Sequence, residues 1–277
     1  MTQLPEEMPK KVLVARETGA SNWLTALPIK AKGFSLNKQE FTDALALRYG
    51  WPINGLPLTC PCGSDYNEIH AMSCQKGGFV CMRHDEVRDV TAELLQEIVN
   101  DVKVEPQLQP ITGEEFRWKT ANTAKDARLD ISARGFWTRR QRAFFDIRIC
   151  NPMAQSYQGK TLKEIHTKNE KDKMREYSER VINIEQGSFT PLVFTTSGGM
   201  GPQAKIFYAR IAELMAEKKQ EPQSYFTAWM RCRLSFSLLR SALLCLRGTR
   251  ANMYKTEEIK NLDFEDVVLE SKIMSDI

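Results

Sequence analysis

The chain has 277 residues and a net charge of +4, with 42% hydrophobic and 27% charged residues, which are ordinary values for a globular protein. No stretch approaches 18 consecutive apolar residues, so a membrane-spanning helix is excluded, and residues 1–20 lack the apolar run of a secretory signal. We therefore expect a nuclear or cytoplasmic protein of one large or two small domains, with no membrane partner.

The charge is unevenly distributed along the chain. Residues 251–277 contain seven acidic side chains and three lysines, which leaves a body, residues 1–250, of about +8 and a tail of −4. A basic body favours a polyanionic partner such as nucleic acid.

Few regular elements are expected in the N-terminal part. Residues 1–22 are polar and predicted to be irregular. Asn37 followed by Glu40 is a typical capping pair, and it predicts a helix that runs to about Arg48. Beyond a cysteine-rich stretch, apolar residues recur at helical spacing over 83–100. Residues 102–105 have the pattern of a short strand, which Pro106 ends.

The second half alternates strands with helices. Residues 110–125 are loop-like, strands are expected at 128–133, 143–150 and 191–195, and helices at 161–182, 204–219 and 224–247. Three successive strands indicate a meander, and the strand–helix–strand step indicates a parallel neighbour, so we expect a mixed α/β sandwich. The segments we distinguish are an N-terminal helical and linker region, a finger, an α/β domain, a basic amphipathic helix and an acidic tail, at 1–55, 56–82, 83–220, 221–250 and 251–277.

Four of the seven cysteines lie between residues 60 and 81. In a reducing compartment they are free thiols or metal ligands rather than disulfides. Cys60, Cys62, His70 and Cys74 supply four ligands within 15 residues, which can close a tetrahedron around a structural Zn²⁺. Cys81 and His84 are alternative ligands, and a chance grouping of free thiols is the other interpretation. Three further cysteines are expected in the core: Cys150, Cys232 and Cys245.

Two aspartates lie inside apolar, strand-like runs. Asp130 occurs in Arg-Leu-Asp-Ile and Asp146 in Phe-Phe-Asp-Ile-Arg-Ile. A carboxylate in such a run is costly to bury unless it is paired, and a Mg²⁺ ion is one suitable partner. If the turn near Gly135 reverses the chain, both carboxylates converge at one edge of the sheet. They would then hold one divalent metal that polarises a phosphate and activates a water.

Other charged residues are candidates for the same site. Arg148 follows Asp146 by two positions and so projects to the same face, where a cation could stabilise charge on phosphorus. Lys173 lies one helical turn from Tyr177, whereas Lys171 lies at a different azimuth; the alternative is that these lysines only solvate the helix. Glu105 or Glu86 could complete the metal site, or could be ordinary surface acids.

Several arginines are candidates for phosphate contacts. They precede the first aspartate, lie in the basic turn, or alternate with apolar residues on the C-terminal helix, and they are Arg128, Arg139, Arg140, Arg231, Arg233 and Arg240. For the C-terminal helix, an amphipathic core helix is an equally good interpretation.

The ordered set of motifs resembles a known family. A Cys-Cys-His-Cys finger is followed by Arg83-His84-Asp85, Glu105-Pro106, Arg128-Leu129-Asp130, Asp146-Ile147-Arg148 and Lys173-x-x-x-Tyr177. This is similar to the C-terminal zinc finger and restriction-like endonuclease of site-specific non-LTR retrotransposons, which belong to the PD-(D/E)XK superfamily. The resemblance covers roughly residues 50–200. Leu129 replaces the usual proline, and Arg148 occupies the position of the superfamily lysine, whose place Lys173 would take.

The resemblance implies a restriction-endonuclease-like mixed sheet flanked by helices, with an N-terminal zinc-finger segment and C-terminal helices. It also implies a Mg²⁺- or Mn²⁺-dependent endonuclease that nicks double-stranded DNA for target-primed reverse transcription, with element RNA and a reverse transcriptase as partners. The chain lacks a polymerase motif before the finger, so we expect a fragment or a domesticated or remnant copy.

Two other functions remain open at this stage. The same fold could be a catalytically silent DNA-binding module, or the finger could belong to a zinc-dependent interaction domain in which the acidic residues are structural. Metal-dependent nicking separates the first hypothesis from the second, and salt-dependent DNA binding separates the second from the third.

Overall fold

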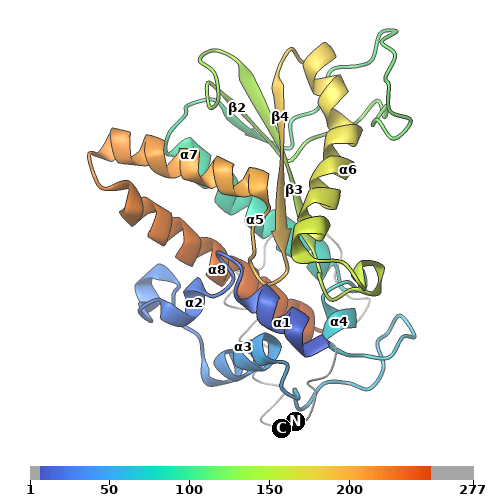
Figure 1. The fold of residues 1–277 in the computed structure, drawn as a ribbon, viewed down its shortest axis with the longest axis vertical. Helices are drawn as coiled ribbons and strands as arrows, with labels where there is room; N and C mark the ends of the chain where they lie inside the picture. The colour runs from blue at the N-terminus through green and yellow to red at the C-terminus, as the bar shows by residue number, and fades with distance from the viewer. Residues whose placement is uncertain (1–6, 251–277) are drawn as a thin grey trace.

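The computed structural model describes residues 7–250, and its centre is a four-stranded mixed sheet (Figure 1). The strands lie in the order β1-β2-β3-β4, which is also their order in the chain. They are β1 (Val102–Val104), β2 (Ile131–Arg134), β3 (Arg142–Cys150) and β4 (Ser188–Thr195). The first two pairings are antiparallel, and β3 pairs with β4 in parallel.

Helix α6 (Leu162–Asn183) makes the crossover that the parallel pair requires. It begins at a capping box. The Thr161 side chain accepts a hydrogen bond from the Glu164 backbone N–H, and the Glu164 side chain accepts one from the Thr161 backbone N–H. The helix then runs along one face of the sheet, where Tyr177 and Val181 pack on Phe144. Nearer the start of the helix, Ile165 packs on the sheet with Val193 and Cys150.

The opposite face of the sheet carries the largest apolar core. Phe145 and Ile147 of β3 point to this side, where α5 (Phe79–Gln96) and α7 (Pro202–Lys219) cover them. Side chains alternate between faces along a strand, so Asp146, between these two residues, faces α6 instead. The long helix α8 (Gln223–Arg247) packs behind α5 and α7 and gives Leu234 and Leu238 to the same core.

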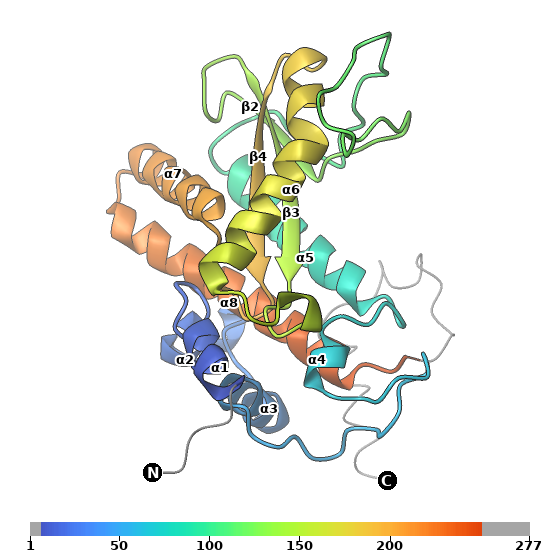
Figure 2. The ribbon, with the colours of Figure 1, turned by 45° about the vertical axis from the view of Figure 1, so that its right-hand side comes forward.

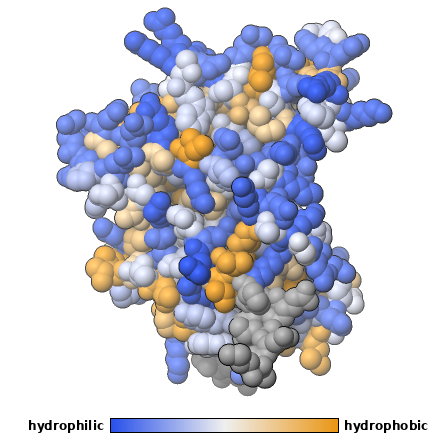
Figure 3. Space-filling model, in the orientation of Figure 1, coloured by the Kyte–Doolittle hydropathy of each residue, from blue (hydrophilic) through white to orange (hydrophobic). Residues whose placement is uncertain are grey.

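The N-terminal helices lie against α8 at the end of the molecule away from β2 (Figures 1 and 2). They are α1 (Glu7–Ala15), α2 (Asn22–Thr25), the 3-10 turn η1 (Lys30–Lys32), α3 (Lys38–Tyr49) and α4 (Glu68–Ala71); a second 3-10 turn, η2 (Gln155–Tyr157), precedes α6. Trp23 is buried here, and its backbone N–H donates to the Ser235 hydroxyl of α8 at 3.1 Å. Over the face drawn in Figure 3, hydrophilic side chains dominate the upper half and apolar ones are more frequent below.

Most predicted elements are present. The α/β character and the mixed sheet are confirmed, as is the capping box of Asn37 and Glu40. The prediction that residues 1–22 are irregular is wrong for Glu7–Ala15, which form α1. Lys10 Nζ of this helix donates a hydrogen bond to the Tyr157 carbonyl at 2.8 Å. Strand β2 begins one residue after Asp130, and α5 begins four residues before the expected start at 83.

The acidic tail lies outside the described residues, and the proposed segment limits stay predictions. Within residues 7–250, no helix combines the length and apolarity needed to cross a bilayer.

A long connection between β1 and β2 is anchored to α6 by Arg180. This side chain is fully buried, and its guanidinium donates to the carbonyls of Gln109, Asn122 and Ala124 at 2.8–2.9 Å. The backbone N–H of Asn122 donates to the Glu176 carbonyl at 2.8 Å. A loop without regular structure is thus fixed against the helix that faces Asp146.

Replacing Arg180 by Leu should orphan three carbonyls and lower the free energy of unfolding by roughly 3 kcal/mol, because an unsatisfied buried acceptor costs about 1–3 kcal/mol. Urea unfolding measures the loss, and hydrogen exchange should rise across residues 108–126. Lys168→Leu, on the exposed side of α6, is the control and should change stability by no more than about 0.5 kcal/mol. Equal effects of the two substitutions would contradict the anchoring role.

Candidate functional site

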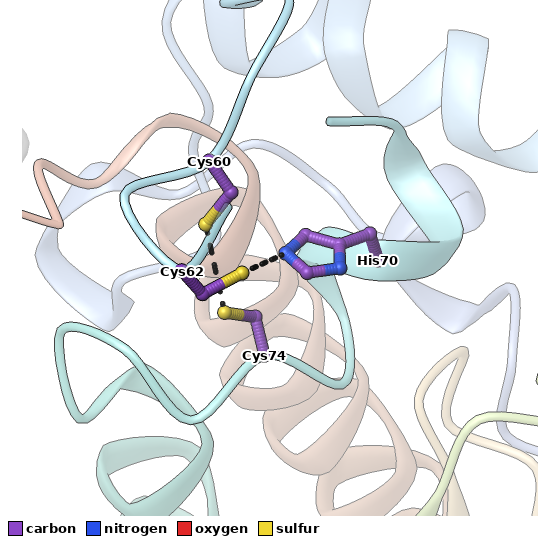
Figure 4. A group of neighbouring side chains, drawn as sticks. All are labelled: Cys60, Cys62, His70 and Cys74. Carbon is purple, nitrogen blue, oxygen red and sulfur yellow. Dashed lines mark hydrogen bonds between the residues drawn. The ribbon is translucent and has the colours of Figure 1, made fainter. Parts of the chain in front are cut away.

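The first candidate site is a group of four metal-ligating side chains (Figure 4). The ligand atoms of Cys60, Cys62, His70 and Cys74 all lie within 4.8 Å of one another. The Cys60 and Cys74 sulfurs are 3.6 Å apart, and the Cys62 sulfur is 3.4 Å from His70 Nε2. This is the ligand set expected from the sequence, and it lies in the N-terminal half of the chain, after α3, rather than at the terminus itself.

Local backbone structure brings these ligands together. Residues 60–64 form a tight turn in which Gly63, at φ +91°, donates its N–H to the Cys60 carbonyl at 2.8 Å. A side chain is disfavoured at this φ, which explains the glycine. His70 comes from the short helix α4, whose first turn is capped by the Asn67 side chain, and the next turn delivers Cys74.

The two cysteines of the Cys-Pro-Cys turn are in different environments. Burial raises the pKa of the Cys60 thiol, whereas hydrogen bonds from the side chain and backbone of Ser64 lower the pKa of the exposed Cys62 thiol to about 6. A thiol with a lowered pKa is readily deprotonated, which is the form that binds metal. Three sulfurs and one imidazole with no open fourth position are consistent with a structural zinc site.

The alternative ligands do not join this group. Cys81 is exposed on α5, and His84 contacts Asp130. Of the remaining cysteines, Cys150 and Cys245 are buried, as expected for core residues, and Cys232 is partly buried.

Zinc should bind this group at about one ion per chain, which elemental analysis of the purified protein measures. Cys62→Ser should release the zinc and expose residues 56–82 to proteolysis, because three ligands close the site poorly. Cys81→Ser, which changes an exposed cysteine outside the group, should retain the zinc. A full zinc content in the Cys62 variant would remove this ligand set.

The second candidate site lies where β2 and β3 meet α6. Ile131 pairs with Phe145, so Asp130 and Asp146 occupy the next pair of positions along the same two chains. Asp130 Oδ2 accepts a hydrogen bond from the Ile147 N–H at 2.5 Å and one from His84 Nε2 at 3.2 Å. The two aspartates therefore lie side by side on neighbouring chains and not at an edge of the sheet, because Asp146 is in the middle of β3, between β2 and β4, and Asp130 precedes β2.

Asp146 is buried, with 5% of its surface exposed. Its Oδ2 lies 2.9 Å from Lys173 Nζ, yet this oxygen accepts no hydrogen bond of normal geometry. Burial raises the pKa of Asp146 to about 6; the charge of Lys173 opposes this rise and that of Asp130 adds to it. A buried carboxylate with an incompletely used oxygen and a second carboxylate beside it is a suitable place for a cation.

Lys173 is positioned by α6. Its ammonium group contacts Asp146, lies 3.5 Å from Glu176 Oε2 and stands 5.2 Å from the centre of the Tyr177 ring. Burial would lower the pKa of Lys173, but Asp146 outweighs this effect and raises it, so the lysine stays charged. Lys171 is exposed. Lys173 therefore points towards β3 and Lys171 towards solvent, so the two lysines lie on different sides of α6.

His84 is a partner of Asp130 that the sequence interpretation did not assign. Burial disfavours its charged ring, but hydrogen bonds with Asp130 and Asp85 outweigh burial and raise the pKa of His84 to about 10. The charged imidazole, together with the Ile147 N–H, fixes the orientation of the Asp130 carboxylate. The sequence motif Arg83-His84-Asp85 contains this histidine, but the spacing of the residues does not identify Asp130 as its partner.

The two glutamates considered as further ligands are differently placed. Glu105 follows β1 at φ +48°, and its N–H donates to the Asp130 carbonyl at 2.8 Å. Its carboxylate pairs with Arg88 at 2.5 Å and lies 3.6 Å from Arg128. Glu86 instead faces Ser237 and Arg233 of α8. Glu105 is therefore beside the aspartates but engaged by arginine, and Glu86 lies on another side of α5.

The candidate phosphate-binding arginines fall into two sets. Arg128, Arg139, Arg140 and Arg231 are exposed. Arg233 pairs with Glu93 and lies over the Trp229 ring, and Arg240 donates to the Ser35 carbonyl at 3.0 Å. Arg148 is partly buried on the face of β3 that carries Asp146, and it forms no hydrogen bond or ion pair with residues 7–250. DNA binding by all of them stays a prediction.

A divalent metal at the aspartates would need ligands from outside the protein. Within residues 7–250, the one group of three or more His, Cys, Asp or Glu side chains close enough to hold an ion is the Cys60 group. Asp130 and Asp146 would supply two carboxylates, and Mg²⁺ commonly takes its remaining ligands from water and substrate phosphate. The donor set fits such a cation.

A scan against protein-family models and a search of curated proteins found no match to this chain.

Proposed function

We propose that this protein is a divalent-metal-dependent DNA endonuclease of the PD-(D/E)XK kind. The observation that carries the proposal is the convergence of Asp130 and Asp146 on neighbouring chains, with Lys173 from α6 in contact with Asp146. The order helix, three strands, helix, strand from α5 to β4 agrees with the core of the resembled superfamily. Leu129, in the place of the usual proline, is buried and packs with Phe144 beneath α6, so the substitution keeps an apolar residue there.

Each residue has a defined task in this proposal. When bound, a Mg²⁺ or Mn²⁺ ion held by Asp130 and Asp146 would polarise the scissile phosphate and lower the pKa of a water. Lys173 contributes a fixed positive charge beside the reacting phosphate, and Arg148, which forms no hydrogen bond or ion pair within residues 7–250, contributes a second on the same face. His84 and the Ile147 N–H hold the Asp130 carboxylate in place.

The substrate follows from charge and from the resemblance. A body of about +8 with Arg128, Arg139 and Arg140 exposed suits a polyanion, and its binding to DNA is expected to weaken steeply with salt. In the resembled retrotransposons the nick primes reverse transcription, so element RNA and a reverse transcriptase are the further partners that we propose. The finger would act as a structural element beside the nuclease.

A catalytically silent DNA-binding module is the second candidate. It is favoured by the Lys173–Asp146 ion pair, which already neutralises the buried carboxylate, and by the engagement of Glu105 with Arg88. Nicking of supercoiled plasmid in Mg²⁺ or Mn²⁺ decides between the two functions.

Asp130→Asn and Asp146→Asn should each reduce plasmid nicking by several orders of magnitude, the scale expected when metal and electrostatic stabilisation of a transition state is lost. Asn has nearly the same shape as Asp, so circular dichroism and zinc content should be unchanged. Nicking that persists in both variants would place the active site elsewhere. Wild-type protein that binds DNA but never nicks it would select the silent module.

Lys173→Ala should reduce the rate of nicking at saturating DNA by at least about tenfold while changing DNA affinity by less than about threefold, because the lysine acts at the reacting phosphate. Single-turnover kinetics separates the two effects. Lys171→Ala is the matched control for the chemical step, since this lysine is exposed on the same helix, and its nicking rate at saturating DNA should stay near that of the wild type. Equal losses in both variants would assign Lys173 to general DNA attraction.

A further inference from the structure

Trp118 is a large aromatic side chain held at the surface. It is 37% exposed, and it belongs to no apolar cluster formed by residues 7–250. The guanidinium carbons of Arg117 and Arg175 lie 5.0 and 5.2 Å from its ring centre. Burial therefore does not account for this residue, whereas an aromatic ring with flanking cations is a recurrent arrangement for binding nucleobases and phosphates.

The loop that carries Trp118 is fixed to α6, at the helical turn that also carries Lys173. The Trp118 carbonyl accepts the Ala121 N–H at 3.0 Å, and the next residue, Asn122, donates to the Glu176 carbonyl and to the Tyr177 hydroxyl at 2.8 and 3.2 Å. Glu176 and Tyr177 belong to the same turn of α6 as Lys173. Arg180 anchors the loop further along the helix. The loop is thus ordered along α6, and the Trp118 ring lies over Arg175, on a different side of the helix from Lys173.

Basic residues lead from the surface of α6 to this ring. Lys168, Lys171 and Arg175 are spaced by three and four positions, so they form one exposed stripe. Asp172 partly neutralises it, at 3.1 Å from Lys168 and 4.0 Å from Arg175. A stripe of this kind can follow a phosphate backbone, with Trp118 at its end.

We propose that Trp118 stacks on an unpaired base of DNA bound along α6, and that Arg117 moves from the ring to a phosphate when the base binds. An exposed cation–π contact is worth only about 0.5–1 kcal/mol, so a phosphate readily displaces it. Bases within an intact duplex are covered by their neighbours, and a ring can stack only on a base that is unpaired or extruded. The inference rests on the proposed function and narrows its substrate to DNA that presents an unpaired or extruded base to the exposed side of α6.

Fluorescence of 2-aminopurine tests the stacking directly. A duplex with one unpaired 2-aminopurine and a fully paired duplex of the same sequence are titrated with the full chain, without Mg²⁺ or Mn²⁺, so that binding is measured without cleavage. The wild type should quench the unpaired fluorophore and bind the bulged duplex at least about tenfold more tightly than the paired one, the scale of one base–aromatic stack.

Substitutions of Trp118 test whether its aromatic ring causes the quenching and the preference for the bulged duplex. Trp118→Leu should abolish the quenching and the preference while changing affinity for the paired duplex by less than about twofold, and Trp118→Phe should retain most of both. Trp51→Leu is the control, because Trp51 is also an exposed tryptophan, 55% exposed, on the segment after α3 at the opposite end of the molecule.

The outcomes distinguish this inference from the nuclease activity. Quenching that depends on Trp118 in a protein that never nicks DNA would support the stacking site and remove the nuclease function. Equal affinity for the two duplexes, or the same losses in the Trp51 and Trp118 variants, would overturn the stacking site even if nicking is observed, and no DNA binding at all would overturn both the stacking site and the nuclease function.

Discussion

The burial of Asp146 in the central strand is the constraint on which the rest of the site depends. A carboxylate among Phe144, Phe145 and Ile147 is costly unless a cation lies beside it. Lys173 supplies that cation, and its 2.9 Å contact sets which turn of α6 lies over β3. The same helix then anchors the connection between β1 and β2 through Arg180. The buried charge of Asp146 therefore helps to set the positions of α6, the sheet and the connection between β1 and β2.

The finger and the aspartates are linked by the beginning of α5. This helix starts at Phe79, five residues after the last ligand of the metal-binding group. Arg83 is buried and donates to the Met72 carbonyl at 3.1 Å, next to that group, while the following residue, His84, contacts Asp130. Zinc at Cys60 to Cys74 would stabilise the start of α5 and so the orientation of His84. The metal-binding group and the aspartate site are chemically distinct, but both are next to residues at the beginning of α5.

The predictions succeeded where a local pattern carried the information. The strand at β3, the helix α6, the capping box of Asn37 and Glu40 and the Cys-Cys-His-Cys spacing each depend on neighbouring residues, and all are present. Helix α1 was missed because its residues show no clear cap, and its contacts are tertiary, such as Lys10 with the Tyr157 carbonyl. Asp130 is held by His84, 46 residues away, and by Ile147 on the neighbouring strand, and the carbonyls that Arg180 contacts lie 56 to 71 residues away, so no local pattern could identify these partners.

The direct test of a divalent cation at Asp130 and Asp146 is anomalous X-ray scattering from crystals of the zinc-loaded protein with DNA and Mn²⁺. The account predicts a manganese peak within coordination distance of both carboxylates, on the side of β3 that faces α6, and its loss in Asp146→Asn. A map without this peak, in which Lys173 alone contacts Asp146 and DNA is bound, would contradict the account.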